Sequence, residues 1–287
     1  MALLALHGSV VAVTGGARGI GLATARALIE RGARVALGDI DLDLARDAAA
    51  QLGPHALALP LDVRRRASFE AFLAATEERF GPLDALVNNA GIMPSGDFLA
   101  EPDGMSDAQI DVNLRGVILG CKVALPRLLA HGRGHIVNVA SMAGRLPVPG
   151  LAVYCATKFA VVGLTETLAE EYRDSGVDFT AVLPAKVTTE LAAGTERAGR
   201  GIPTVSAEDV AAAIVGALDH PVGEVTVPRY LKALAPLQSS APRPVLRTVR
   251  RALGDRRILN ELDAQARAGY TSRIARLAVT DAPEGAA

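Results

Sequence analysis

The stretch Thr14-Gly15-Gly16-Ala17-Arg18-Gly19-Ile20-Gly21 (residues 14–21) joins an apolar run, 10–14, to a segment with helical periodicity, 19–30. Glycines at such a junction let the chain turn sharply and let its backbone approach a phosphate closely. The helix that follows would offer free N–H groups and the positive end of its dipole to that phosphate. The stretch predicts a dinucleotide site, although a glycine-rich turn alone could also be purely structural.

The alternation of apolar runs and helical patterns continues beyond this turn to residue 228. Strands are expected at 10–14, 34–39, 56–60, 83–88, 135–140, 177–183 and 223–227, and helices at 19–30, 42–52, 67–80, 106–130, 152–174 and 206–218. Ser206 is expected to cap the last of these helices, with Asp209 completing a capping box. Such alternation, with strands that are almost continuously apolar, predicts an α/β fold with a doubly wound parallel sheet covered by helices on both faces.

Composition and charge limit the classes of function. Of 287 residues, 50% are hydrophobic, which is enough for a sizeable core, and the net charge of −1 gives no general attraction to nucleic acid or to an anionic membrane. The charge is uneven, because residues 1–228 carry 19 Lys/Arg and 26 Asp/Glu, whereas residues 229–277 carry 11 and 3. We therefore expect one dinucleotide-binding and catalytic domain, 1–228, followed by a basic helical C-terminal extension, 229–287.

Compartment signals are few. Cys121 and Cys155 form no disulfide pattern and no metal-ligand spacing, so a reduced, cytoplasmic setting without a metal site is expected. The apolar N-terminus lacks a basic region and a cleavage site, and it is expected to be structure and not a signal peptide. No charge-free run reaches the roughly 20 residues that span a bilayer.

Asp39 ends the second expected strand, 18 residues after Gly21. A carboxylate at this place can accept hydrogen bonds from the adenosine ribose and would repel a 2′-phosphate, which favours NAD over NADP. Arg18 argues the other way, since its guanidinium could bind that phosphate. Asp39 is given more weight, although it could also be an ordinary turn-starting aspartate.

Two further polar stretches follow neighbouring strands. Asp62-Val63 comes after the third strand, and Asn88-Asn89-Ala90-Gly91 comes after the fourth. Ligands of open α/β sheets bind at the carboxyl ends of strands, so both stretches are candidate cofactor contacts. Either one alone could be ordinary turn chemistry.

Three side chains predict a proton-transfer site. Tyr154 and Lys158 are four residues apart and share one face of an expected helix, while Ser141 follows the preceding strand. A nearby ammonium and a positive nicotinamide ring favour the phenolate of a tyrosine, whose ordinary pKa is about 10. Tyr154 could then exchange a proton with an alcohol or ketone held by Ser141, and Asn113 could hold a water that links Lys158 to solvent.

Together these motifs resemble the short-chain dehydrogenase/reductase family over residues 8–228. The resemblance rests on residues 14–21, Asp39, Asp62, 88–91, Asn113, Ser141 and 154–158. It implies a single Rossmann-type domain with about seven parallel strands and hydride transfer at the nicotinamide. It also implies Ser141 as the carbonyl-orienting residue, Tyr154 as the acid/base, Lys158 as a ribose ligand that tunes the tyrosine, and Asn113 as the water holder. Family members are usually dimers or tetramers built through helices at 106–130 and 152–174, so a homo-oligomer is expected.

One segment departs from the family pattern. The sixth strand is followed by Pro184-Ala185-Lys186-Val187-Thr188, where the family commonly has glycine at the second position. Pro184, Val187 and Thr188 are the expected cofactor contacts, with Thr188 hydrogen-bonding the carboxamide. In the family the next segment, 189–205, is a mobile lid over the substrate, and Gly194, Gly199 and Gly201 are its expected hinges.

The expected pocket walls are largely apolar: Met93, Phe98, Met142, Leu146, Val148, Leu151 and Cys155. A hydrophobic secondary alcohol or ketone fits such walls better than a small acid does.

The basic tail holds two amphipathic segments, 244–253 and 258–277. In the second, Ile258, Leu262, Ala266, Tyr270 and Ile274 recur every fourth residue. Three interpretations stay open: packing on its own domain or a neighbouring subunit, peripheral contact with an anionic membrane, or another partner or partial disorder.

The leading prediction is an NAD-dependent oxidoreductase that interconverts a secondary alcohol and a ketone. The first alternative is an NADP-linked ketone or ketoacyl reductase, against which Asp39 argues. The second is a non-catalytic nucleotide-binding scaffold, against which Ser141, Tyr154, Lys158 and Asn113 argue. An epimerase or dehydratase built on the same residues is also compatible with the motifs.

Overall fold

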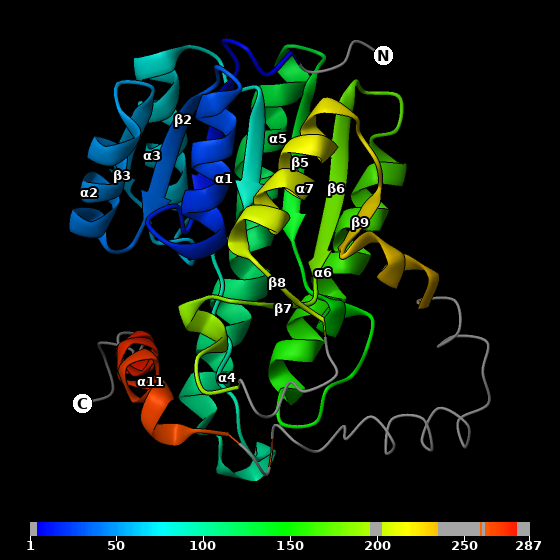
Figure 1. Ribbon diagram of the computed structural model, residues 1–287. Helices are drawn as coiled ribbons and strands as arrows, with labels where there is room; N and C mark the ends of the chain where they lie inside the picture. Colours follow the sequence, from blue (N-terminus) through cyan, green and yellow to red (C-terminus); the bar gives the residue numbers. More distant parts are fainter. Residues whose placement is uncertain (1–4, 196–202, 235–258, 260–261, 280–287) are drawn as a thin grey trace, which may run out of the picture.

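A computed structural model describes residues 5–195, 203–234, 259 and 262–279 of the chain. Its centre is a seven-stranded sheet in the order β3-β2-β1-β4-β5-β6-β9 (Figure 1), and all neighbouring strands run parallel. The strands are β1 (Val10–Thr14), β2 (Arg34–Asp39), β3 (Ala56–Pro60), β4 (Ala85–Asn88), β5 (Gly134–Val139), β6 (Val177–Pro184) and β9 (Glu224–Val227). The strand order reverses between β1 and β4, which places a ligand crevice at their carboxyl ends. The predicted Rossmann-type α/β fold is confirmed.

Helices cover both faces of this sheet. One face carries α1 (Gly19–Glu30), α2 (Leu42–Leu52) and α7 (Ala207–Asp219), and the other carries α3 (Arg66–Phe80), α4 (Asp103–Ile110), α5 (Gly116–Ala130) and α6 (Ala152–Glu171). Val11 and Val13 of β1 face Leu28 of α1, whereas Ala12 between them faces the cluster that contains Phe69 of α3. Side chains of this kind stabilise the fold by about 1.5–3 kcal/mol each when fully buried. The alternation along each strand therefore fixes which helix layer lies on which face.

The Ser206 capping box is confirmed at the start of α7. The Ser206 hydroxyl oxygen accepts a hydrogen bond from the Asp209 N–H at 3.0 Å, and the Asp209 carboxylate accepts one from the Ser206 N–H at 2.9 Å. Asp209 occupies the third position of the capping box, where glutamate or glutamine is more usual, and its shorter side chain still reaches the N-cap backbone.

The single helix expected over 106–130 is wrong in detail. The structure has α4, then a π-helical turn at Asp111–Arg115, then α5. The wide turn is marked by the Gly116 N–H, which donates to the Asp111 carbonyl five residues back. Asn113 lies in this turn and binds the backbone of Ile92, so a tertiary contact holds the distortion in place.

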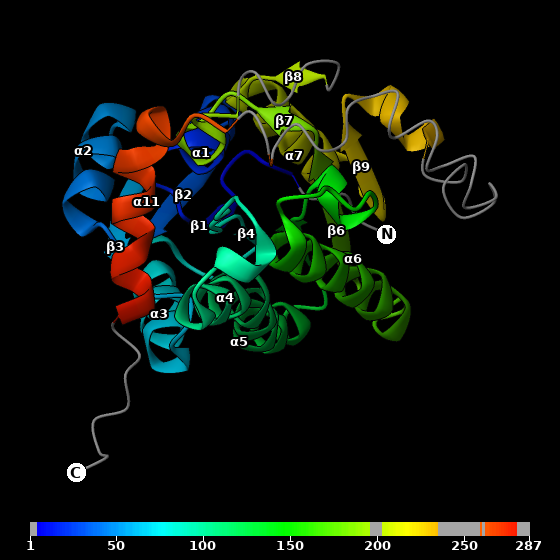
Figure 2. The ribbon, with the colours of Figure 1, turned by 90° about the horizontal axis from the view of Figure 1, so that it is seen from below.

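The C-terminal helix α11 (Ala264–Val279) lies beyond the carboxyl ends of the strands, on the β3 side of the sheet (Figure 2), and contacts α4. Tyr270 and Ile274 are 3% and 2% exposed and join the core cluster on the α3–α5 side of the sheet. A helix within 258–277 is confirmed from residue 264, whereas the one expected at 244–253 lies outside the described residues. The division of the chain at residue 228 remains a prediction. Within the described ranges, no helix combines the length and the hydropathy needed to cross a membrane.

Candidate active site

The turn between β1 and α1 has the backbone shape that a phosphate needs. Gly15 and Gly19 have positive φ angles of 63° and 52°. A Cβ atom on Gly15 would lie 3.0 Å from the Ala90 Cα, so only glycine lets the turn approach the β4 side this closely. Helix α1 begins after Arg18 without a side-chain cap, which leaves its first N–H groups facing the crevice.

Asp39 lies at the end of β2 and its side chain is 9% exposed. Its carboxylate accepts hydrogen bonds from the backbone N–H groups of Ala17 and Asp41, both at 3.1 Å. Each carboxylate oxygen has two acceptor positions, so Asp39 can hold the turn and still receive ribose hydroxyls. The Arg18 guanidinium forms an ion pair with Asp41 at 2.9 Å, so its charge is already balanced by another carboxylate.

The loops after β3 and β4 form the next part of the crevice. Asp62 pairs with Arg64 at 2.9 Å. Burial opposes ionisation of Asp62, but hydrogen bonds from the Arg64 side chain and backbone outweigh it and lower the pKa of the carboxyl. Asn89 donates from its side-chain amide to the carbonyls of Thr14 and Gly15, at 3.0 and 3.1 Å. Asn89 therefore ties the β4 loop to the phosphate turn.

One cavity of about 750 Å³, the cofactor cleft, brings most of the predicted site residues together. Its lining includes the predicted residues Gly15, Arg18, Gly19, Ile20, Asp39, Asp62, Val63, Asn89, Ala90, Gly91, Ser141, Tyr154, Lys158, Pro184 and Val187. Gly21, Asn113 and Thr188 do not line it. The position of Gly21 allows close packing of α1 against the turn, because an added Cβ would collide with the Gly15 carbonyl.

Thr189, and not Thr188, faces the cofactor cleft. Val187 belongs to the two-residue strand β7 (Lys186–Val187), and the N–H of Thr188 donates to Val205 of the partner strand β8 (Thr204–Val205). Alternate residues of an extended chain point the same way, so Thr189 joins Val187 in the lining. Of the two threonines, Thr189 and not the predicted Thr188 thus lines the cleft.

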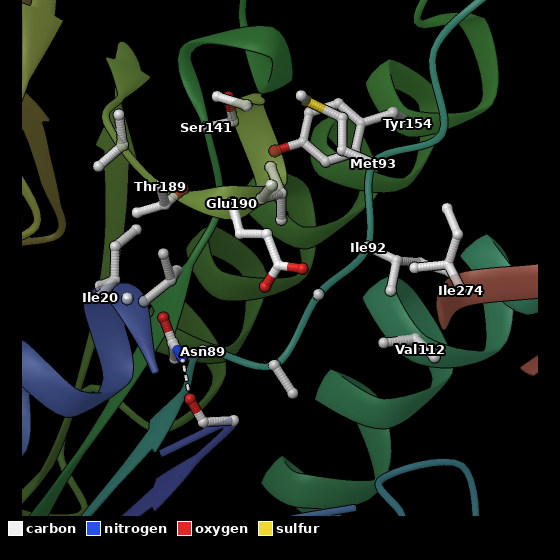
Figure 3. Close-up of a pocket in the computed structure, with 18 of the residues that line it drawn as sticks. Ile20, Asn89, Ile92, Met93, Val112, Ser141, Tyr154, Thr189, Glu190 and Ile274 are labelled. Carbon is white, nitrogen blue, oxygen red and sulfur yellow. Dashed lines mark hydrogen bonds between the residues drawn. The ribbon is translucent and has the colours of Figure 1, made fainter. Parts of the chain in front are cut away.

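Tyr154 and Ser141 meet inside the cleft. The Tyr154 side chain is 7% exposed, and its hydroxyl points toward Ser141 (Figure 3). Burial raises the pKa of Tyr154 above its usual value, and the hydrogen bond with Ser141 only partly opposes this shift. In the structure burial thus prevails over the pKa-lowering effect that the neighbouring lysine was expected to have. The Ser141 hydroxyl oxygen also accepts a hydrogen bond from the Ala143 N–H at 3.1 Å, which fixes its direction.

Lys158 lies one helical turn after Tyr154, as the i+4 spacing predicted. Its ammonium is 5.7 Å from the centre of the Tyr154 ring and donates to the Val139 carbonyl at 2.8 Å. Burial lowers the pKa of Lys158 from its usual value to about 8. The ammonium is therefore held at the tyrosine by the end of β5, in a position where it can act on the phenol.

Asn113 performs a structural task with its side chain. Its amide oxygen accepts from the Ile92 N–H, and its amide nitrogen donates to the Ile92 carbonyl, both at 2.8 Å. The same nitrogen donates to the Thr157 hydroxyl at 3.3 Å. These contacts join the β4 loop to α6 and engage the Asn113 side chain, while its role as a water holder stays a prediction.

The apolar end of the cleft surrounds Tyr154. Met93, Ala143, Leu151, Tyr154 and Cys155 form one small core cluster, with Val148 and Leu191 packed against it. Met93, Met142, Val148 and Leu151 line the cleft as predicted. Phe98 does not, because its side chain is 63% exposed, and Leu146 packs into the main core instead.

Two further groups of residues line the cleft: the first belongs to the segment 189–205 that was expected to lie over the substrate, and the second was not predicted. Thr189, Glu190, Leu191, Ala192 and Thr195 come from the segment after β7, and Tyr270, Arg273, Ile274, Arg276 and Leu277 come from α11. The amphipathic pattern at 258–277 indicated a buried face but not the surface that it covers. Gly194 has a φ of 75° and contacts the start of α11, whereas Gly199 and Gly201 lie outside the described residues.

These residues fit a dinucleotide. A glycine turn at an open helix end suits a pyrophosphate, a buried carboxylate at the next strand suits a ribose, and the tyrosine end suits a redox-active ring. The arrangement defines a class of protein, a dinucleotide-binding α/β domain with a proton-transfer site beside the place of the nicotinamide.

Comparison with known proteins gives the family. The family model of short chain dehydrogenases matches residues 9–199. The chain is 38% identical over 191 residues to 2,5-dichloro-2,5-cyclohexadiene-1,4-diol dehydrogenase of Sphingobium indicum, covering 66% of this chain and 76% of that protein. It is 41% identical over 187 residues to 2-(S)-hydroxypropyl-CoM dehydrogenase 3 of Xanthobacter autotrophicus, covering 64% and 73%.

A solved structure has a similar fold. It is a crystal structure of 3-ketoacyl-(acyl-carrier-protein) reductase from Brucella melitensis complexed with NADH, with a TM-score of 0.70 and 29% identity. The match covers 77% of this chain and 98% of that one. The protein belongs to the short-chain dehydrogenase/reductase family, whose members are oxidoreductases that act on CH–OH groups with NAD(H) or NADP(H).

Proposed function

We propose that the protein is an NAD-dependent dehydrogenase that interconverts a hydrophobic secondary alcohol and its ketone. The observation that carries this proposal is the Tyr154 hydroxyl, which points toward Ser141 between an apolar pocket and the cofactor cleft. At this place the Tyr154 hydroxyl can exchange a proton with the oxygen of a substrate whose carbon exchanges a hydride.

A nicotinamide cofactor held in this cleft would supply hydride chemistry at the carbon of the alcohol or ketone. Ser141 orients the substrate oxygen by a hydrogen bond, and Tyr154 takes the hydroxyl proton or supplies it to the carbonyl oxygen. Lys158, whose ammonium is 5.7 Å from the centre of the Tyr154 ring, would stabilise the phenolate through its positive charge. Thr189 and Val187 would contact the carboxamide end of the cofactor.

The preference for NAD is supported by Asp39. Its buried carboxylate lies at the end of β2, where it would repel a 2′-phosphate. Arg18, the one residue of the turn that could favour NADP, is already paired with Asp41 and Glu190. The Asp39 carboxylate therefore argues against the alternative of an NADP-linked ketone or ketoacyl reductase.

The substrate class is inferred from the walls around Tyr154. Met93, Met142, Val148, Leu151 and Leu191 offer apolar surface. Burying apolar substrate surface against them would contribute about 25 cal/mol per Å².

The test is a reduction assay with NAD and NADP over secondary alcohols of graded polarity. We expect faster turnover with NAD and rates that rise with the apolar size of the alcohol. Tyr154→Phe should lose activity by about 10²-fold or more and keep NADH binding, with Tyr172→Phe at the far end of α6 as the matched control. Activity that survives in Tyr154→Phe would overturn the mechanism, and no turnover with NADH bound would support the scaffold alternative.

We also propose a homodimer or homotetramer built through α5 and α6, in the cytoplasm. Leu129 of α5 and Phe159 of α6 are large apolar side chains that are 36% and 43% exposed on these helices. Phe159→Glu should lower the assembled mass in light scattering if the helices form the interface. Peripheral membrane contact through the basic tail stays a prediction, which co-sedimentation of the full chain with anionic vesicles would test.

A further inference from the structure

Helix α11 is hydrogen-bonded to one side of the cofactor cleft. The Arg267 guanidinium donates to the carbonyls of Leu191 and Ala193, at 3.1 and 2.7 Å, and also to the carbonyl of Met93. The Tyr270 hydroxyl oxygen accepts from the Met93 N–H at 2.7 Å. Arg267 is only 3% exposed, so α11 is joined to the segment after β7 by buried bonds.

The same helix also reaches the opposite side of the cleft. Arg64, which pairs with Asp62 after β3, donates to the Leu277 carbonyl near the end of α11 at 3.1 Å. Ile274 lies near Ile92 and Val112 at the edge of the cleft (Figure 3). Helix α11 therefore spans the cleft and belongs to the cofactor site.

A carboxylate lies between two guanidinium groups at the mouth of this cleft. One oxygen of Glu190 is 2.6 Å from Nη1 of Arg273 in α11 and 3.3 Å from Nη1 of Arg18. Arg18 is the N-cap residue of α1, so the carboxylate is beside the phosphate turn. The neighbouring Thr189 packs close to the same turn: a Cβ atom added to Gly19 would lie 3.4 Å from its methyl carbon.

We propose that Arg273 is a ligand for the pyrophosphate of the cofactor and that Glu190 is an internal anion which the pyrophosphate displaces. Figure 3 shows the Glu190 side chain directed into the cavity, between Ile20 and Ile92. An anion bound at the start of α1 would compete with Glu190 for Arg18 and Arg273. The inference rests on the dinucleotide site alone and not on the substrate proposed above.

Charge decides the outcome of this competition. A pyrophosphate brings two negative charges and several acceptor oxygens to the guanidinium pair, whereas Glu190 brings one charge. Arg18 would lose Glu190 but keep its second partner, Asp41, whereas Arg273 would exchange Glu190 for the pyrophosphate. The repelled Glu190 would move together with Leu191 and Ala193, which are bonded to Arg267 of α11. Cofactor binding would thereby be transmitted to the C-terminal helix.

The first experiment measures the binding of ADP, adenosine and NADH to the full chain by calorimetry at one ionic strength. Arg273→Gln should weaken ADP and NADH binding about threefold to tenfold, a range typical of partly exposed ion pairs, and leave adenosine binding unchanged. Arg173→Gln removes the same charge from an exposed ion pair with Glu170, just after α6 and away from the residues that line the cleft, and is the matched control. Equal losses in the two variants, or an equal loss for adenosine, would overturn the assignment of Arg273.

The second experiment tests the displaced anion with Glu190→Gln. Removing the internal competitor should tighten ADP and NADH binding severalfold without changing adenosine binding. Weaker ADP binding in this variant would overturn the displacement. Circular dichroism of each variant separates loss of folding from loss of binding. A protein that bound NADH with these shifts but oxidised no alcohol would refute the proposed function and leave this inference intact.

Discussion

The hydroxyl oxygen of Tyr270 accepts a hydrogen bond from the backbone N–H of Met93, so the C-terminal helix is bonded to the loop that follows β4. Both residues are buried, at 3% and 8% exposure. We expect Tyr270→Phe to lower the free energy of unfolding by about 1–2 kcal/mol, because a buried N–H loses its acceptor. Urea denaturation of the full chain measures this change. Tyr230→Phe, with its side chain 64% exposed, is the matched control and should change the free energy little.

The charge of Asp39 should set the choice between the two cofactors. Asp39→Asn keeps a carbonyl oxygen for the turn but removes the negative charge that would repel a 2′-phosphate. We expect the ratio of kcat/KM with NAD to that with NADP to fall about tenfold or more. Asp43→Asn, on an exposed carboxylate of α2, should leave the ratio unchanged. A ratio that stayed constant in Asp39→Asn would mean that another residue reads the ribose.

His135 should make the fold sensitive to acid. Its Nε2 is 2.9 Å from the Thr180 hydroxyl oxygen, whose own proton is donated to the Val222 carbonyl, so Nε2 carries the hydrogen of the neutral ring. Burial lowers the pKa of His135 from 6.5 to about 4. The unfolded chain therefore binds this proton first, and stability that is fully present above pH 6.5 is lost as the pH falls toward 4.

The loss attributable to His135 is about 3 kcal/mol over that range, as an order of magnitude. Urea denaturation between pH 7 and pH 4.5 should show a shallower decline in His135→Gln than in the natural protein. His55→Gln, at an exposed position, should retain the natural decline. Identical slopes for all three proteins would contradict the assignment.

Gly194 should control how firmly α11 is held. Its φ is 75°, and an added Cβ would lie 3.2 Å from the Arg267 Cβ and still closer to the Asp263 carbonyl. We expect Gly194→Ala to cost about 1–3 kcal/mol of local stability and to speed tryptic cleavage at Arg273 and Arg276. Gly223→Ala is the control, since no atom lies within 4 Å of the place that its methyl group would take. Unchanged cleavage in Gly194→Ala would show that the close approach does not hold the helix.

The sheet and the phosphate turn could be predicted because they depend on local pattern. The apolar run at 10–14, the glycines after it and the helical periodicity from Gly19 each required the same strand–turn–helix unit. Tyr154 and Lys158 were found in the same way, since their i+4 spacing on a helix determines that they meet.

Features set by distant contacts could not be predicted. The π turn at 111–115 has no signal in its own residues, because the contact of Asn113 with Ile92 maintains it. Thr188 was expected in the cleft, but the direction of its side chain depends on the pairing of β7 with β8. Arg267 is a charged residue in the core, and only the carbonyls of the folded chain explain its burial.

Helix α11 is synthesised after the strands and loops that form the rest of the cofactor cleft. Both sides of the cleft come from residues 10–227, and α11 begins at Ala264, so the helix leaves the ribosome after the site that it crosses. Domains fold largely as they emerge, so a nascent chain presents an open nucleotide crevice before its last segment arrives. A dinucleotide can load at that stage, before Arg273 of α11 pairs with Glu190. Once formed, the helix would lie over the loaded site, so we expect it to slow the release of the cofactor.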